Sequence, residues 1–560
     1  MKRTKMLRAV GALGAVALLA TACGTDEPTS TDPTETDGTT DGTDGTDGTD
    51  GEDMGPVVLS TYIVEPEHLA PPATNESEGS AVLQSLFKGL IDYDVRTTEP
   101  VLVVAESITT DDNQTYTVKI ADGWTFHNGE AVTANSFVKA WNWTADADNA
   151  ELSQVASFFS SVEGWAAINE ATDGDSLTGM TGLTLVDEMT FTITLSAPNP
   201  TFPVQLGYTS YYPLPEAFYD DPAAFENAPI GNGPFEMDGT WEHDVQIATK
   251  RFEGYAGADP AQIDGLVFKI YADQLTAYND LVAGNLDIMD SLPTEQIEDA
   301  KSRFGDRFQA TPSSSINYLG LPTYVEWLGD VRLRRALSMA TDQAQITTQI
   351  FNDDRVPAYS MINPVIPGHR ATVCDNWGTD AAAAKALWDE AGGYDGPIEL
   401  WFNQGAGHDD WVEAVSNQWV NVLGISPDQI TFQSLDFSEY LPKIDGKELT
   451  GPFRLGWGMD YPHPENYTYP MFHSESFSPN GSNATFFSNP EFDAAVDAGK
   501  QQTSLDEAIP FFQTAEDILC AEVPVIPMFF GLNQFASAER VTGLYVDAFG
   551  NINYTEVSGA

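Results

Sequence analysis

The stretch Pro397-Ile-Glu-Leu-Trp-Phe402 decides the fold class of this chain, together with the two segments that follow it. Residues 397–402 and 429–435 have the apolar and β-branched character of strands. The intervening segment, 411–423, has an apolar side at helical spacing and ends at Gly424. That side consists of Trp411, Val415, Trp419 and Val422. A strand, a helix and a strand in this order predict a βαβ unit, and hence an α/β fold with mixed sheets flanked by helices.

A glycine-rich loop, Asn403-Gln-Gly-Ala-Gly-His408, follows the first of these strands. Loops at the carboxyl ends of strands face the ligand crevices of α/β proteins. Asn403 and His408 are therefore candidate binding residues. For His408 the alternative is an exposed loop histidine without a role.

A second stretch, Arg454-Leu-Gly-Trp-Gly-Met-Asp-Tyr-Pro462, places a cation, a large aromatic ring and a carboxylate within seven residues. Its first half is apolar enough for a buried strand, and Asp460-Tyr-Pro begins a turn. Arg454, Trp457, Asp460 and Tyr461 are candidate binding residues at the end of that strand. The alternative is that Trp457 belongs to the core and that Arg454 and Asp460 form an ordinary ion pair.

Helices and strands alternate through the rest of the chain. Residues 114–120 and 190–195 alternate apolar and polar side chains, which predicts two half-buried strands. A helix capped by Thr133 is expected between them. Further helices are predicted over 330–351 and 381–391, the latter ending at Gly392.

The N-terminus has the pattern of an export signal. Basic residues precede an apolar run from Ala9 to Ala20, which is too short to cross a bilayer. Small residues directly before Cys23 resemble a lipobox, which predicts a lipoprotein signal peptide over 1–23 and lipidation of Cys23. Residues 24–55 are almost entirely Thr, Asp, Gly, Pro and Glu, which predicts a disordered tether.

The remaining residues, 56–560, are too many for one compact core, so at least two lobes are expected. The formal net charge of the chain is −59, and most of it lies on this body rather than on the tether. Such a charge argues against nucleic acid and anionic lipid as partners. A solvated acidic surface, a saline habitat and a preference for cationic ligands all remain open as its explanation.

Cys374 and Cys520 are an even pair once lipidation uses Cys23. In an exported, oxidising setting a disulfide between them is possible, and two buried free thiols are the alternative.

Familiar catalytic motifs are absent from the sequence. It contains no Gly-x-Ser-x-Gly, no His-Glu-x-x-His, no phosphate-binding loop and no paired Cys-x-x-Cys. The seven histidines lack metal-ligand spacing, so neither a metal nor a cofactor is expected. An acid and base pair of carboxylates remains conceivable, as in a hydrolase.

Several segments in order resemble the family 5, peptide-binding class of solute-binding proteins that serve ABC importers. The resemblance runs from about Pro56 to the C-terminus. The matching segments are 83–90, Gly123-Trp-Thr-Phe-His-Asn-Gly-Glu-Ala-Val-Thr-Ala134, Pro229-Ile-Gly-Asn-Gly-Pro-Phe235, 333–340, 384–391 and Val523-Pro-Val-Ile-Pro527.

The resemblance implies roles for the candidate residues. Oligopeptide-binding members have a carboxylate that holds the α-amino group of the ligand and an arginine that holds the C-terminal carboxylate of the ligand. Asp460 and Arg454 occupy the corresponding places in this sequence. Asn403 and His408 match a pair that also contacts ligand. Fixed opposite charges suit a zwitterionic ligand, since charge-assisted hydrogen bonds are the strong ones. Trp457 and Tyr461 would supply apolar walls.

The family also implies a two-lobed clam-shell with an extra subdomain in lobe I. We expect lobe I at 56–311 and 526–560, with an insertion at about 96–224, and lobe II at 312–525. The implied protein is no enzyme but a monomeric, lipid-anchored receptor on the outer face of the cytoplasmic membrane. It captures short peptides for an ABC permease. The alternatives are a non-peptide solute such as a metal chelate, siderophore or oligosaccharide, and, from a different class, an exported hydrolase.

Overall fold

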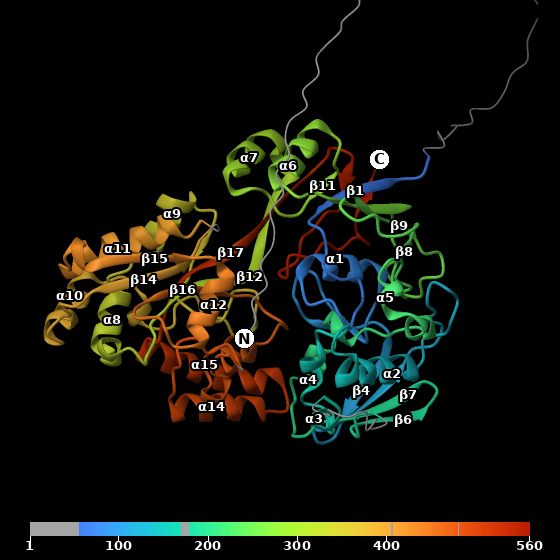
Figure 1. Cartoon of the computed structure of the whole chain (residues 1–560), viewed down its shortest axis with the longest axis horizontal. Coiled ribbons are helices and arrows are strands. Elements are labelled where there is room, and N and C mark those ends of the chain that lie inside the picture. The colour runs from blue at the N-terminus through green and yellow to red at the C-terminus, as the bar shows by residue number, and fades with distance from the viewer. Residues whose placement is uncertain (1–54, 170–178, 405–406, 480, 560) are drawn as a thin grey trace, which may run out of the picture. The chain divides into compact units, whose positions relative to one another are not determined.

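The computed structural model describes residues 55–169, 179–404, 407–479 and 481–559 (Figure 1). The signal segment, Cys23 and the tether to residue 54 lie outside the described residues. The helices are α1 (Ser77–Leu86), α2 (Ala134–Ala145), α3 (Trp165–Asn169), α4 (Phe202–Gln205), α5 (Pro222–Phe225), α6 (Gln274–Ala283), α7 (Ile297–Phe304), α8 (Val331–Met339), α9 (Gln343–Phe351), α10 (Ala381–Glu390), α11 (Asp409–Leu423), α12 (Phe437–Asp445), α13 (Tyr469–Phe472), α14 (Pro490–Lys500) and α15 (Leu505–Glu522).

An 11-stranded mixed sheet organises the described chain, in the order β15-β14-β16-β12-β17-β11-β1-β10-β9-β8, with β13 beside β17. Its strands are β1 (Val58–Ile63), β8 (Phe235–Met237), β9 (Gln246–Arg251), β10 (Gly265–Ile270), β11 (Ile288–Met289), β12 (Phe308–Gly320), β13 (Val356–Pro357), β14 (Ile398–Asn403), β15 (Ile430–Leu435), β16 (Phe453–Trp457) and β17 (Val525–Ser537).

Two long strands, β12 and β17, occupy the middle of this sheet. They pair antiparallel from Phe308 opposite Ala536 to Gly320 opposite Val525. The register shifts between Pro312 and Ile316, and again beyond Asn317, so the ladder bends there. Figure 1 shows the two strands running side by side between the β14 to β16 region and the β1 region.

The predicted βαβ unit is confirmed. Strands β14 and β15 pair in parallel, and α11 connects them. The indoles of Trp411 and Trp419 are fully buried in a core shared with α8 and α10. Gly424 ends α11 in the left-handed conformation, at φ 78°, as its position in the sequence indicated.

The prediction of a single helix over 330–351 is wrong, because the structure has two helices there, α8 and α9. Asp342 is the cause. Its side chain accepts a hydrogen bond from the Gln345 amide and begins a new helix, so the apolar spacing continues across a break.

A second, four-stranded sheet has the order β4-β5-β7-β6, and α2 packs against it. Its strands are β4 (Ala105–Thr110), β5 (Thr115–Ile120), β6 (Leu183–Asp187) and β7 (Thr190–Thr194). Strands β5 and β7 confirm the alternating patterns, and Thr133 caps α2 in a capping box with Ser136. Two small sheets pair β2 (Ile91–Tyr93) with β3 (Pro100–Leu102) and β18 (Val541–Thr542) with β19 (Ser558–Gly559).

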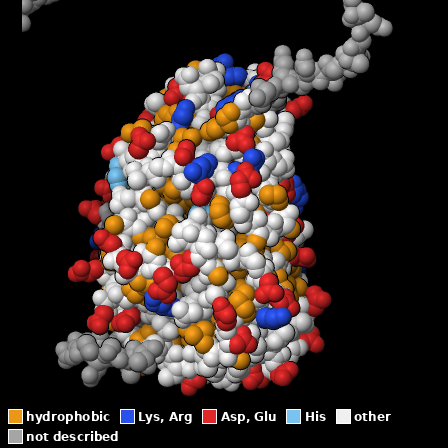
Figure 2. Space-filling view, turned by 90° about the vertical axis from the view of Figure 1, so that its right-hand side faces the viewer, with side chains coloured by type: hydrophobic (Ala, Val, Ile, Leu, Met, Phe, Trp, Pro, Cys, Tyr) orange, Lys and Arg blue, Asp and Glu red, His pale blue; other side chains and the backbone are white. Residues whose placement is uncertain are grey.

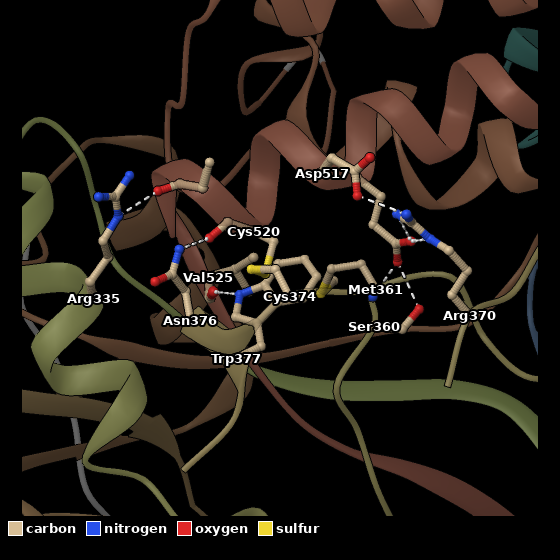
Figure 3. Close-up of a disulfide and its surroundings, with 12 residues drawn as sticks. Arg335, Ser360, Met361, Arg370, Cys374, Asn376, Trp377, Asp517, Cys520 and Val525 are labelled. Atoms are coloured by element: carbon tan, nitrogen blue, oxygen red, sulfur yellow. Dashed lines mark hydrogen bonds and ion pairs between the residues drawn. A yellow bond between two sulfur atoms is a disulfide. The ribbon is translucent and has the colours of Figure 1, made fainter. Parts of the chain in front are cut away.

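Cys374 and Cys520 form a disulfide, with their Cα atoms 6.2 Å apart (Figure 3). It ties the segment before α10 to the last turn of α15. Hydrogen bonds reinforce the junction, because Asn376 donates to the Cys520 carbonyl and the Trp377 indole donates to the Val525 carbonyl. The disulfide therefore closes a long loop onto the start of β17.

We expect loss of this disulfide to destabilise the fold without touching the candidate binding residues. Replacing both cysteines by alanine should lower the free energy of unfolding by about 2–5 kcal/mol, because the closed loop limits the entropy of the unfolded chain. Chemical denaturation with and without reductant measures the effect. Reductant should destabilise the wild type and leave the double variant unchanged, and a wild type indifferent to reductant would contradict the expectation.

The surface of the described chain is acidic. On the face shown in Figure 2, carboxylates are spread among polar and apolar groups, with fewer basic side chains between them. Within residues 55–559 as described, no helix is long and apolar enough to span a membrane. Nor does that part of the chain hold a group of three or more His, Cys, Asp or Glu side chains placed to bind a metal ion.

Candidate functional site

Strand β16 presents the residues of the central motif. It pairs antiparallel with β12, with Arg454 opposite Leu319 and Trp457 opposite Ile316. The chain then leaves the sheet at Gly458, and Asp460 follows in a turn. Strand pairing therefore fixes the backbone positions of Arg454 and Trp457, whereas the position of Asp460 depends on local hydrogen bonds.

The amide side chain of Asn466 supplies those hydrogen bonds. Its Oδ1 accepts from the backbone N–H of Asp460 and from the indole of Trp457, both at 3.1 Å. Its Nδ2 donates to Asp460 Oδ2 at 2.9 Å. One neutral side chain thus holds both the carboxylate and the aromatic ring of the motif.

Asp460 is a desolvated carboxylate without a cationic partner among the described residues. Burial raises its pKa, and the hydrogen bond from Asn466 opposes that shift. Its charge also reaches Tyr208, whose pKa is raised to about 12 by burial and then by Asp460. Both residues line the same cavity, so Asp460 lies near the segment between α4 and α5, which is far away in the sequence.

Arg454 lies in a separate cluster formed with Asn403 at the end of β14 and Asn317 on β12. Its Nη1 donates to Asn403 Oδ1 at 3.0 Å, and its Nη2 to Asn317 Oδ1 at 2.5 Å. Its Nε is buried without a hydrogen-bond partner in the part of the chain described. The guanidinium is thus held by two neutral amides, and the ion pair with Asp460 considered above does not form.

Burial lowers the pKa of Arg454 to about 10, so the side chain is still charged at neutral pH. His408 belongs to the same cluster and is 8% exposed, rather than an open loop histidine. Burial, and then the charge of Arg454, lowers the pKa of His408 to about 4. Its Nδ1 accepts from the Trp411 indole at 3.3 Å, which leaves the proton of the neutral ring on Nε2. His408 is therefore a neutral hydrogen-bond donor.

Trp457 and Tyr461 flank Asp460 in the sequence but are turned to different partners. Trp457 packs at the edge of the core beneath β16, with its indole bound to Asn466. The hydroxyl of Tyr461 donates to Glu465 Oε2 at 2.5 Å. Neither side chain lines the large cavity beside Asp460.

That cavity has a volume of 860 Å³, within the range of small-molecule sites. Its wall includes Asp460, the N-terminal part of α1, the 207–212 segment, the end of β17 and the 547–551 segment. Asp460 is the only one of the six predicted binding residues that lines it among the residues described. Arg454, Asn403 and His408 lie together outside it.

Sequence reasoning missed several residues of this region. Asn466 lies six positions after Asp460 and was within reach of a local argument about turn hydrogen bonds. Asn317, Tyr208 and the cavity-lining Arg355 come from distant segments. No pattern in the sequence links them to the motif, since only the folded sheet brings them there.

The comparisons with known proteins identify the class. Residues 99–479 match the family described as bacterial extracellular solute-binding proteins, family 5. The match covers more than half of the chain, so the chain belongs to this family. Members are extracytoplasmic binding proteins of ABC transporters rather than enzymes.

Particular relatives span nearly the whole length. The oligopeptide-binding protein OppA of Bacillus subtilis (strain 168) is 26% identical over 511 residues, which are 88% of this chain and 90% of that protein. Among solved structures, the periplasmic murein tripeptide-binding protein MppA in its unliganded open form has a TM-score of 0.78 and 22% identity, covering 90% of this chain and 99% of its own. Haemophilus influenzae OppA in complex with the peptide RPPGFSPFR has a TM-score of 0.69 and 22% identity, covering 90% and 99%. The two-lobed fold of periplasmic peptide-binding proteins, expected from the sequence, is confirmed.

Proposed function

We propose that this protein captures short peptides outside the cytoplasmic membrane and delivers them to the permease of an ABC importer. The observation that carries the proposal is a pair of desolvated, opposite charges, Asp460 and Arg454, neither of which has an ion-pair partner among the described residues. Desolvated charges are costly unless they are paired. A zwitterionic ligand with an ammonium at one end and a carboxylate at the other would pair both.

The two ends of the peptide take different partners in this proposal. The α-ammonium lies in the cavity against Asp460, which Asn466 orients. The carboxylate meets Arg454, with Asn403 and His408 beside it. Neutral amides already hold the guanidinium in place, so its remaining donor capacity is available to an anion. The names of the relatives, which refer to oligopeptides and a murein tripeptide, agree with this class of ligand.

For peptide capture we propose two lobes. Lobe I comprises residues 56–311 and 526–560, with the insertion at about 96–224, and lobe II comprises residues 312–525. Strands β12 and β17 would be the two crossings between the lobes. The ligand is held where the lobes meet, and it favours the closed form only by its higher affinity for that form. The permease recognises the closed form, and the protein does no chemistry.

The membrane attachment proposed here is through lipid on Cys23, with residues 24–55 as the tether of a monomer. Stable attachment requires more than one acyl chain, since a single chain binds a bilayer only weakly. Mass spectrometry of the mature N-terminus would test it, because lipidation adds a defined mass to a chain that begins at Cys23.

Native mass spectrometry of the protein, purified without unfolding, tests the ligand class. We expect masses that match bound short peptides and that are lost on acidification, which protonates Asp460. A single discrete non-peptide mass, such as a chelate or an oligosaccharide, would keep the family and overturn the cargo. Peptides that are added intact and recovered cleaved would instead favour a hydrolase. If no ligand is retained, peptides should still raise the melting temperature, and their failure to do so would overturn the proposal.

A further inference from the structure

The wall of the 860 Å³ cavity is strongly biased in charge. Arg355 is its one basic side chain within the described part of the chain. Six carboxylates line the same space: Glu76, Glu78, Asp92, Asp290, Asp460 and Asp547. The net charge of the whole protein does not require this arrangement, because a solvated outer surface can hold its carboxylates far apart.

Most of these carboxylates lack a cation of their own. Asp92 forms an ion pair with Lys88 at 2.5 Å. For the other five, the described residues offer no Lys, Arg or His in ion-pairing contact. Asp547 is occupied in a different way, since its Oδ1 accepts from the backbone amides of Phe549 and Asn551, both at 2.9 Å. Glu76 is occupied in a similar way, since both of its carboxylate oxygens accept from the backbone amide of Gly79 at 2.8 Å. The excess charge is therefore concentrated on Glu78 and Asp290, in addition to Asp460.

Glu78 and Asp290 are candidates for a second cation subsite, because both line the cavity together with the ring of Tyr62. Burial raises the pKa of Asp290 to about 7, and the negative charge of Glu78 adds to the shift. Both charges also act on Tyr62, whose pKa is raised to about 12 by burial, then by Asp290 and then by Glu78. Tyr62 lines the same cavity. Two carboxylates beside an aromatic ring are a suitable environment for an ammonium or guanidinium group.

The wall also contains buried polar atoms without partners, an independent sign that it meets a polar ligand. Thr209 is 2% exposed and Gln534 is 8% exposed, and both line the cavity. Thr209 Oγ1 and Gln534 Nε2 have no hydrogen-bond partner among the described residues. Buried polar atoms are seldom left unpaired unless something else pairs with them.

We propose that the cavity selects peptides that carry a cationic side chain, and that Glu78 and Asp290 bind this side chain while Asp460 binds the α-ammonium. The inference rests on the proposed function in taking the ligand to be a peptide. It adds the chemical class of the side chain and the residues that recognise it. A lysine or arginine side chain relieves the repulsion between Glu78 and Asp290, which a neutral side chain leaves in place.

Titration calorimetry with matched tripeptides tests the proposal. Lysine is placed at each position in turn, and norleucine, a neutral side chain of similar length, replaces it in the reference peptide. We expect the best lysine peptide to bind about tenfold or more tightly than its norleucine reference, the effect of one charge-assisted contact. Glu78→Gln with Asp290→Asn should bring the ratio of the two dissociation constants close to one.

A matched control separates the subsite from the general attraction of an acidic protein. Asp111 and Glu151 are exposed and do not line the cavity. Asp111→Asn with Glu151→Gln removes the same charge and should keep the lysine preference. If the cavity variant does not fold, Asp290→Asn and Glu78→Gln are measured singly, and each should reduce the preference.

The pH dependence gives a second readout. Asp290 faces Glu78 of α1, Tyr62 of β1 and Tyr554 near the C-terminus, whose pKa Asp290 raises. A bound cation favours ionised Asp290, so binding releases a proton. The ratio of norleucine to lysine dissociation constants should therefore rise from pH 5 to pH 7 and level off above the pKa of Asp290, which is about 7. The norleucine peptide has the same α-ammonium, so its titration cancels in the ratio.

The possible outcomes distinguish failure of this inference from failure of the proposed function, peptide capture. Equal affinity for lysine and norleucine peptides, or a lysine preference kept in the cavity variant, overturns the inference and leaves peptide capture standing. Binding of spermidine without binding of any peptide supports a cation site but overturns the peptide. Binding of none of these ligands overturns the proposed function, and the inference with it.

Discussion

Asp460→Ala weakens the binding of a short peptide by about 2–5 kcal/mol, if Asp460 holds the α-ammonium as proposed. The substitution leaves a desolvated ammonium in a cavity without its partner, so the ligand loses its hydration and gains nothing in exchange. Asn466 also loses the carboxylate that it orients, and its amide can still accept from Trp457. Titration calorimetry at fixed ionic strength measures the effect.

A second peptide makes this test specific. An N-acetylated version of the same peptide has no ammonium, and it should bind the wild type weakly and be nearly indifferent to Asp460→Ala. Asp111→Asn, at an exposed position outside the cavity, should bind both peptides as the wild type does. Equal losses for the free and the acetylated peptide would mean that Asp460 acts through the fold and not through the ligand.

Glu516→Ala lowers the free energy of unfolding by about 3–5 kcal/mol, because several donors, most of them buried, lose a fully buried carboxylate as their acceptor. Glu516 is fully buried on α15, one turn before Cys520. Its Oε1 accepts from the Ser360 hydroxyl and from two backbone amides of the same segment. Its Oε2 pairs with Arg370 at 2.9 Å. The substitution removes this acceptor from Ser360, Met361 and Arg370, which are labelled in Figure 3.

The neighbouring residue is a matched control for Glu516. Asp517 also pairs with Arg370, at 2.7 Å, but its side chain is 54% exposed. Asp517→Asn should change stability by no more than about 1 kcal/mol, since exposed ion pairs contribute little. Denaturant unfolding of both variants provides the comparison. Similar losses for the two would show that the charge of Arg370, and not the buried hydrogen bonds of Glu516, controls stability here.

The fold was predictable where local pattern and tertiary packing agree. Residues 397–435 form a parallel βαβ unit in which the apolar side of α11 packs into a core. The helical spacing of apolar residues in the sequence reflects this burial, so the unit could be predicted. Residues 330–351 show the limit of this reasoning. Apolar spacing continued past Asp342, but its side chain caps a new helix, and a local hydrogen bond outweighs the periodicity.

The candidate site was predictable only where it is local in sequence. Arg454 and Asp460 are drawn from one short motif, and both proved to be desolvated. Their separation into two clusters was not predictable, because it depends on Asn317 of β12 and on the course of the chain around Asn466. The acidic cavity wall was equally hidden, since Glu78, Asp290 and Asp547 lie hundreds of residues apart and meet only in the folded chain.

The place of β17 in the sheet has a consequence for how the protein is made. This strand comes after all the other strands of the sheet in the sequence, yet it lies between β11 and β12 in the middle of the sheet. Until residues 525–537 emerge, β12 has an unpaired edge, and such edges invite pairing with other chains. The central sheet therefore cannot close until residues 525–537 have been synthesised, and chains truncated before Val525 should aggregate rather than persist as a folded half.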